Sequence, residues 1–259
     1  MSPAAPRDPT SPAARGTGGP ADAVVLAAGR GVRLGTLTER TPKVLLEVEG
    51  RALLDYHLLA LRRVGVRRVI LVVHYLAEQV ERHVDGGRPF ELDVTTVRQP
   101  EPRGTGDAVR VATPLVRTDP FLVSYADVFL PNEDIVLREL LADDRPKIVA
   151  AQVPDGGSFG RLSTRQEGAN LRLEGLEEKD GRAVPALVNA GLYLFPKSIL
   201  TIVAGLTPSV RGEYELTDAV RAFVARGGEM LAVSVSDWVD AGTAESLARA
   251  GELARRAHR

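Results

Sequence analysis

A glycine-rich loop carries the residues of this chain whose types and spacing best suit phosphate chemistry. The segment Gly29-Arg30-Gly31-Val32-Arg33-Leu34-Gly35 directly follows an apolar run, and Lys43 comes shortly after it. Glycine N–H groups can approach a phosphate closely, and Arg33 and Lys43 supply the positive charge that a triphosphate demands. One interpretation of this segment is therefore an extended loop that wraps a nucleoside triphosphate.

Two other interpretations of the glycine loop stay open at this point. The glycines could simply permit a tight turn, as loop glycines often do. They could also begin a dinucleotide-binding turn, but that turn needs a helix directly on the glycines and an acidic residue about 20 positions later. Here Thr41-Pro42 breaks the chain and the next predicted strand ends in His74. A Walker-type phosphate loop is excluded, because no G-x-x-x-x-G-K-[ST] occurs.

The composition is that of a globular enzyme with almost balanced charge. The 259 residues include 33 Lys+Arg and 34 Asp+Glu, a formal net charge of −1, and 44% of them are hydrophobic. A general nucleic-acid binder would show a basic excess. The longest apolar run, 23–28, is far below the roughly 18 residues of a membrane span. The absence of cysteine removes disulfides, thiolate metal sites and Cys nucleophiles. We expect a cytoplasmic protein that binds neither nucleic acid nor membrane.

Short apolar runs alternate with amphipathic helical patterns through the first half of the chain. Strands are predicted at 23–28, 68–74, 92–97 and 121–125, and helices at 52–64, 77–84 and 106–112. This alternation predicts an α/β fold with a Rossmann-like, mostly parallel sheet flanked by helices. Ligands of such sheets bind beyond the carboxyl ends of the strands, where the loops 29–43, 99–106 and 126–127 lie. In the second half, strands are predicted at 147–153, 185–195 and 230–235, and helices at 213–225 and 243–256.

A longer ordered pattern around the glycine loop points to one family. The segments Leu26-Ala27-Ala28-Gly29-x-Gly31-x-Arg33-Leu34, Leu37-Thr38 and Pro42-Lys43 resemble the signature of the sugar-1-phosphate nucleotidylyltransferases. Those enzymes join an NTP to a sugar 1-phosphate and release pyrophosphate. The likeness extends to glucose-1-phosphate thymidylyl- and uridylyltransferases and to mannose- or heptose-1-phosphate guanylyltransferases. Val32 and Thr36 depart from the usual Thr and Pro, but neither change removes a charge that the chemistry needs.

Further segments match the family in order from about residue 22 to 250. Gln99-Pro100 and Arg103-Gly104-Thr105-Gly106-Asp107-Ala108 resemble its base-recognition loop, in which a Gln offers both a donor and an acceptor to a nucleobase. Asp127, preceded here by Ala126 instead of the usual Gly, and Asp240 in Trp238-Val239-Asp240-Ala241-Gly242-Thr243 match its two Mg²⁺ ligands. The sugar side is matched by Glu177-Glu178-Lys179, Phe159-Gly160-Arg161, Asn189-Ala190-Gly191 and the segment 212–218.

The resemblance implies a role for each of these positions. It places the nucleotide against Ala27, Ala28, Gly29, Gly31, Gln99, Gly104 and Thr105. It places the sugar phosphate against Gly160, Glu178, Lys179, Asn189 and Glu213. Arg33, Lys43 and Lys179 are the expected catalytic residues, and Asp127 and Asp240 the expected ligands of Mg²⁺.

The same resemblance sets expectations for domains and substrates. We expect a disordered tail over 1–21 and a nucleotidylyltransferase domain over 22–259. Within that domain, residues 22–145 would bind mainly the nucleotide, and residues 146–240 would form a smaller region that binds mainly the sugar phosphate. Residues 241–259 would form a closing helix, and we expect no appended β-helix domain. The favoured donor is dTTP or UTP. The alternatives are GTP, CTP or ATP, or a non-catalytic regulatory module that binds nucleotide-sugars, and homo-oligomerisation stays open.

Overall fold

Buried, Val- and Leu-rich runs form the parallel half of a nine-stranded sheet. The computed structural model describes residues 21–178 and 181–257. Its strands β1 (Ala23–Ala27), β4 (Arg68–Val73), β5 (Asp93–Arg98) and β6 (Phe121–Tyr125) lie in the order β5-β4-β1-β6, and all run parallel. The strand predictions for this half are confirmed to within a residue or two at each end.

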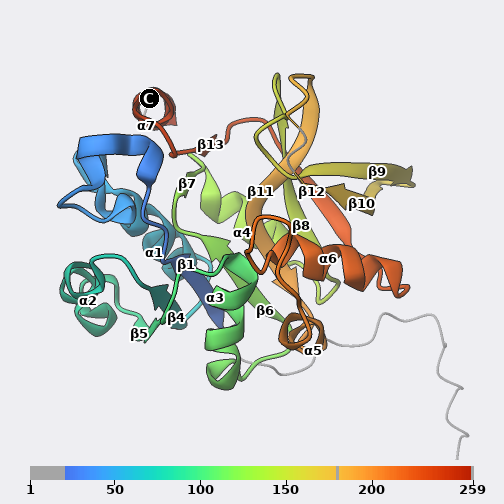
Figure 1. The fold of residues 1–259 in the computed structure, drawn as a ribbon, viewed down its shortest axis with the longest axis horizontal. Coiled ribbons are helices and arrows are strands. Elements are labelled where there is room, and N and C mark those ends of the chain that lie inside the picture. Colours follow the sequence, from blue (N-terminus) through green and yellow to red (C-terminus); the bar gives the residue numbers. More distant parts are fainter. Residues whose placement is uncertain (1–20, 179–180, 258–259) are drawn as a thin grey trace, which may run out of the picture.

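Alternating side chains of β1 enter two separate cores, one on each face of the sheet. Val25 packs in the core that includes the apolar residues of α1 (Leu53–Arg63) and α2 (Ala77–Val84). Val24 packs in the core that includes α3 (Thr105–Ala112). Figure 1 shows these strands and helices, in blue to green, on the left of the molecule. Both faces of the sheet are therefore covered around β1. The edge formed by the carboxyl ends of the strands stays open for a ligand.

The second half of the sheet corrects the expectation of a mostly parallel arrangement. β11 (Ala186–Phe195) runs antiparallel to β6 and to β8 (Lys147–Val153), and β12 (Leu231–Val235) is parallel to β8. β10 (Asn170–Glu177) and β9 (Arg161–Glu167) follow as an antiparallel hairpin, and β9 also pairs with β11, which closes these strands into a ring. The physical reason lies in the connections. Gly168-Ala169 alone joins β9 to β10, and such a short link permits only antiparallel pairing.

Among the described residues, the remaining elements are four helices, two small ladders and four 3-10 segments, and several of them hold site residues. The helices are α4 (Glu133–Leu140), α5 (Ile199–Ala204), α6 (Leu216–Ala225) and α7 (Ala244–Ala257). Two small ladders are added, β2 (Glu47–Val48) with β3 (Arg51–Ala52) and β7 (Val128–Phe129) with β13 (Val239–Asp240). Single 3-10 segments occupy η1 (Val32–Thr38), η2 (Lys43–Leu45), η3 (Asp85–Phe90) and η4 (Thr113–Leu115).

One prediction of local structure needs adjustment. The helix expected over 213–225 begins only at Leu216, because Glu215 is extended and Tyr214 exchanges backbone hydrogen bonds with Arg103 and Gly106. Within the described ranges, every helix is too short or too polar to cross a bilayer. Most of the predicted tail and the last two residues of the predicted closing helix lie outside those ranges, and so does Lys179.

Candidate functional site

The β7–β13 ladder brings together two aspartates that are far apart in the sequence. Asp127 lies in the turn between β6 and β7, and Asp240 is the last residue of β13. Asp240 is in register with Val128, and the Ala241 N–H donates to the Asp127 carbonyl oxygen at 3.0 Å. Both carboxylates lie at the carboxyl end of the parallel strands, where the sequence places the ligand. The predicted pairing of Asp127 with Asp240 in space is therefore present.

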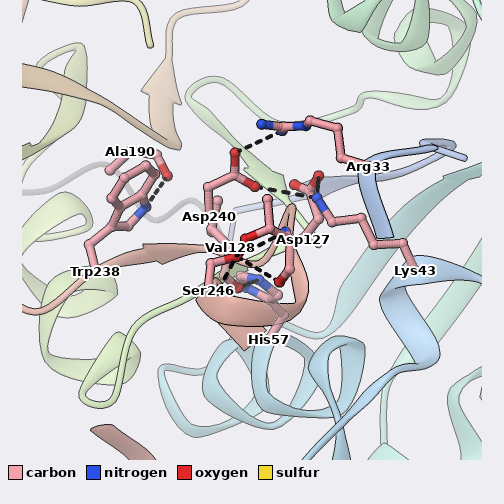
Figure 2. A network of polar contacts seen from close by, with 10 residues as sticks. Arg33, Lys43, His57, Asp127, Val128, Ala190, Trp238, Asp240 and Ser246 are labelled. Carbon is pink, nitrogen blue, oxygen red and sulfur yellow. Dashed lines mark hydrogen bonds and ion pairs between the residues drawn. The ribbon is translucent and has the colours of Figure 1, made fainter. Parts of the chain in front are cut away.

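Lys43 occupies the space between the two carboxylates (Figure 2). Its Nζ donates to Asp127 Oδ2 at 2.7 Å and to Asp240 Oδ1 at 3.3 Å. Arg33 approaches the other oxygen of Asp240, with 3.4 Å between its guanidinium nitrogen and Oδ2. The Lys43 side chain is 5% exposed, whereas that of Arg33 is 61% exposed. Arg33 is thus free to reach a ligand, while Lys43 is held within the cluster.

Burial and Coulomb attraction act in opposite directions on this cluster. Burial disfavours the Lys43 ammonium, but the neighbouring carboxylates of Asp127 and Asp240 outweigh it and raise the pKa of Lys43. Burial likewise disfavours the Asp127 carboxylate, but the charge and hydrogen bond of Lys43 lower the pKa of Asp127. Each group stabilises the charged form of the other. The site therefore holds a preformed set of charges at neutral pH.

A buried histidine supports β7 from the side of helix α1. His57 Nδ1 lies 2.5 Å from Glu133 Oε1, and Nε2 lies 3.0 Å from the Val128 carbonyl oxygen. A neutral imidazole has one N–H, so the protonated ring is the form that donates to both oxygens. Burial alone would lower the pKa of His57, but Glu133 raises it. His57 lies within the helix predicted over 52–64, and the sequence indicates no further role for it. Its partners lie on separate elements, so no local pattern could have revealed this role.

A single pocket connects the aspartates to both halves of the sheet. It has a volume of about 410 Å³ and opens along loops from the parallel strands and from the closed ring. Most predicted site residues line it: Ala28, Gly29, Arg33, Gln99, Gly104, Thr105, Asp127, Gly160, Glu178, Asn189, Glu213 and Asp240. Of the predicted residues that the structure describes, Ala27, Gly31 and Lys43 lie off this lining. Ala27 belongs to the core on the far face, and Gly31 packs against Lys43.

The loop at one end of the pocket depends on a glycine. Gly104 has φ +101°, and a Cβ there would lie 2.6 Å from the Tyr214 carbonyl oxygen. The Gly106 N–H donates to that same oxygen at 2.7 Å, and the Tyr214 N–H donates to the Arg103 carbonyl oxygen at 2.7 Å. These bonds fasten the 103–106 loop to the segment before α6. Only a residue without a side chain fits at Gly104.

A second group of polar side chains near the pocket is held in place by mutual hydrogen bonds. Asn189 Nδ2 donates to the Tyr193 hydroxyl at 2.5 Å, and its Oδ1 accepts from the Gly191 N–H at 3.0 Å. Tyr125 lies 3.2 Å from the Tyr193 hydroxyl, and burial raises the pKa of Tyr125 to about 12. Glu178 accepts hydrogen bonds from Arg211 at 3.1 Å and from the Thr217 hydroxyl. These groups are suited to the hydroxyl groups of a sugar, because they present fixed donors and acceptors.

Several lining residues were given no individual role from the sequence: Arg30, Tyr125, Ser158, Arg211, Glu215, Thr217 and Trp238. Arg30, Glu215, Thr217 and Trp238 lie within matched segments, whereas Tyr125, Ser158 and Arg211 do not. The sequence nevertheless pointed to two of these three. Arg211 directly precedes the segment 212–218 that was selected, and Tyr125 ends the strand before Asp127, at the ligand-binding edge of the sheet.

The sequence as a whole matches a known family model. The model described as nucleotidyl transferase matches residues 22–256, almost the entire described chain. The chain belongs to the nucleotidyl transferase family. The resemblance found in its motifs is therefore confirmed.

Individual relatives agree with the family assignment. A glucose-1-phosphate thymidylyltransferase from Streptomyces griseus is 32% identical over 234 residues, which cover 89% of this chain and 65% of the relative. The chain thus spans a little under two thirds of the length of that relative. A provisionally assigned glucose-1-phosphate thymidylyltransferase from Bacillus anthracis, solved with sucrose, superposes with a TM-score of 0.80 at 26% identity and covers 90% of this chain and 95% of its own.

A second solved structure supports the fold. A UDP-glucose pyrophosphorylase complexed with UDP-glucose superposes with a TM-score of 0.75 at 20% identity. The match covers 92% of this chain and 99% of the other. The mixed α/β architecture described above is therefore that of the nucleotidyl transferases.

Proposed function

We propose that this chain transfers a nucleotidyl group from an NTP to a sugar 1-phosphate and releases pyrophosphate, with dTTP or UTP as the favoured donor. One observation carries the proposal. The pocket that holds Asp127 and Asp240 is lined both by residues of the glycine loop and by the polar groups around Asn189. Such a pocket accommodates two substrates that meet at the acidic pair. The thymidylyltransferase relatives support the same reaction class.

In the proposed reaction, a phosphate oxygen of the sugar 1-phosphate attacks the α-phosphorus of the NTP. The new P–O bond forms in line with the bond to the leaving pyrophosphate, which breaks. This chemistry depends mainly on positioning and charge neutralisation. The exposed guanidinium of Arg33 would hold the triphosphate, and Lys179, which lies outside the described residues, would anchor the sugar phosphate. The assistance of Lys43 at the phosphates stays a prediction, since its ammonium contacts the carboxylates.

The two aspartates fit a Mg²⁺ ion. Asp127 Oδ2 and Asp240 Oδ1 both contact the same ammonium, so they already converge on one cationic group. Mg²⁺ usually takes one or two carboxylates and completes its shell with water and substrate phosphates. The described residues contain no group of three or more His, Cys, Asp or Glu side chains placed to hold a metal. When bound, the ion would neutralise charge on the phosphates.

A binding module without catalysis is the second candidate function. Its supporting observation is the ion pair between Lys43 and Asp127, which ties up a carboxylate that a catalytic metal would need. The retention of two converging carboxylates together with Arg33 favours an enzyme, because binding a nucleotide-sugar requires no such pair. Four expectations stay predictions: donors other than dTTP and UTP, a cytoplasmic location, homo-oligomerisation, and the lack of nucleic-acid or membrane partners.

The test is pyrophosphate release in the presence of Mg²⁺. Each of dTTP, UTP, GTP, CTP and ATP is paired with glucose, mannose and N-acetylglucosamine 1-phosphates. We expect release with dTTP or UTP and one sugar phosphate, and none with D127N. Asp237 is exposed and lies off the pocket, so D237N is a matched control that should keep full activity. No release by the wild type with any pair, together with calorimetric binding of a nucleotide-sugar, would contradict the enzyme and favour the binding module.

A further inference from the structure

The side-chain amide of Gln99 is held in one orientation by its neighbours. Gln99 follows β5 at the edge of the pocket and is 3% exposed. Its Nε2 donates to Asp107 Oδ2 at 2.7 Å and to the Gly104 carbonyl oxygen at 3.2 Å. Both partners are acceptors, so the nitrogen of the amide must face them and Oε1 must face the other way. The backbone is fixed too, because the Gln99 N–H donates to Val73 and its carbonyl accepts from His74.

Asp107 is in turn held by a residue one turn further along α3. The Arg110 guanidinium donates to Asp107 Oδ1, which leaves Oδ2 for Gln99. Arg110 lies over the Tyr214 ring at 4.5 Å from its centroid, so its own position is constrained by a cation–π contact. Asp107 is 5% exposed, and a carboxylate so deeply buried keeps both of its bonds. A continuous series of contacts thus runs from Tyr214 through Arg110 and Asp107 to Gln99.

The fixed amide presents an acceptor, not a donor, to a base in the pocket. Uracil and thymine carry a hydrogen on ring N3, and guanine carries one on N1, so each can donate to Oε1. Cytosine N3 and adenine N1 are acceptors and would face Oε1 with lone pair against lone pair. We propose that Asp107 is a specificity-determining residue, which selects bases with a ring N–H by fixing the orientation of the Gln99 amide. The inference rests on the proposed function, because it requires a nucleobase beside Gln99.

The substitution D107N tests whether Asp107 fixes the orientation of the Gln99 amide. Arg110 can only donate, so the amide oxygen of the new side chain faces Arg110 and its NH₂ faces Gln99. Two NH₂ groups then oppose each other at the shorter of the two Gln99 contacts, 2.7 Å against 3.2 Å to the Gly104 carbonyl oxygen. We therefore expect the Gln99 amide to rotate and present Nε2 to the pocket, with loss of its bond to Gly104. The double variant D107N/R110A lacks the Arg110 guanidinium, so no donor at position 110 fixes the orientation of the new amide. The new amide can then direct its oxygen to Gln99 and restore the original orientation.

The measurement is calorimetric titration of Mg²⁺–UTP and Mg²⁺–CTP, without sugar phosphate, into the full chain. These two nucleotides have the same size and differ at the base edge. We expect the wild type to bind UTP more tightly, D107N to lower the ratio of UTP to CTP affinity about tenfold or more, and D107N/R110A to restore most of it. Asp85 pairs with Arg88 at the same i,i+3 spacing at 2.5 Å, away from the pocket lining, so D85N is the matched control and should leave the ratio unchanged.

The outcomes separate this inference from the proposed function. If D107N weakens UTP and CTP equally, Asp107 is merely structural and the inference is overturned. The same conclusion follows if the wild type binds both nucleotides with equal affinity, or if the ratio falls in D107N but is not restored in D107N/R110A. A wild type that binds neither nucleotide contradicts the proposed function itself. A normal melting temperature in D107N excludes loss of folding as the cause of a changed ratio.

Discussion

The buried pair of His57 and Glu133 predicts that the substitutions H57L and E133Q lower the free energy of unfolding by very different amounts. In H57L the Glu133 carboxylate loses its counter-charge and the Val128 carbonyl loses a donor, both in a buried position. Removal of one partner from a buried ion pair costs about 3–5 kcal/mol. For a domain of this length that corresponds to about 6–20 °C in melting temperature.

E133Q should behave very differently, although it removes the same ion pair. The new amide can donate to Nδ1 of a neutral imidazole, while the Nε2 hydrogen still goes to the Val128 carbonyl oxygen. Both hydrogen bonds are kept and no cavity forms. We therefore expect a loss of no more than about 1 kcal/mol near neutral pH.

The two proteins should also differ in how their stability depends on pH. Burial opposes the charged ring, yet Glu133 raises the pKa of His57 above its unfolded value of about 6.5. The stabilisation from this shift is fully present below that unfolded value and is lost as the pH rises through the folded pKa. The difference in unfolding free energy between wild type and E133Q should therefore shrink as the pH rises.

The assay is denaturant unfolding of wild type, H57L and E133Q at several pH values between about 6 and 9. Comparison of wild type with E133Q cancels the titration of the other groups. The reasoning is refuted if H57L unfolds within about 1 kcal/mol of the wild type, or if E133Q is as unstable as H57L.

Two further predictions concern the packing of the pocket. G104A should lower the unfolding free energy by about 2 kcal/mol or more, because its Cβ would meet the Tyr214 carbonyl oxygen, whereas G168A, also at positive φ but in open space, should cost about 1 kcal/mol. Equal losses in thermal unfolding would show that the contact with Tyr214 is unimportant. W238F should cost about 1–3 kcal/mol, because it removes the Nε1–H donor of the buried Ala190 carbonyl. An unchanged melting temperature would show that this carbonyl finds another donor.

The elements with strong local periodicity could be predicted from sequence alone. The spacing of Ala77, Val80 and Val84 gives α2 its buried face, and the predicted helix has the observed bounds. The inner strand β1 is apolar throughout because both of its faces are covered. In the other half, β8, β11 and β12 were predicted as strands, but the antiparallel direction of β11 and the hairpin of β9 and β10 were not. The strands β9 and β10 are largely exposed, and their pairing depends on the turn between them.

The site was predictable to the extent that its residues belong to ordered motifs. The pairing of Asp127 with Asp240 could be inferred only from the resemblance, because two-residue strands are too short to show a period. The contact of Lys43 with both carboxylates, and that of His57 with Glu133, join residues from distant segments. Such contacts are set by tertiary packing, and a single sequence contains no record of them.

The central claim is that Asp127 and Asp240 act as one site for nucleotidyl transfer. The most direct measurement is pyrophosphate release by D127N, D240N and the double variant with the favoured NTP and sugar phosphate, at several Mg²⁺ concentrations. Residues that act as a unit show strongly non-additive losses. The account predicts that each single variant loses nearly all activity, that the double variant loses no more, and that D237N keeps its activity. Substantial turnover in either single variant, or losses that multiply in the double variant, would contradict it.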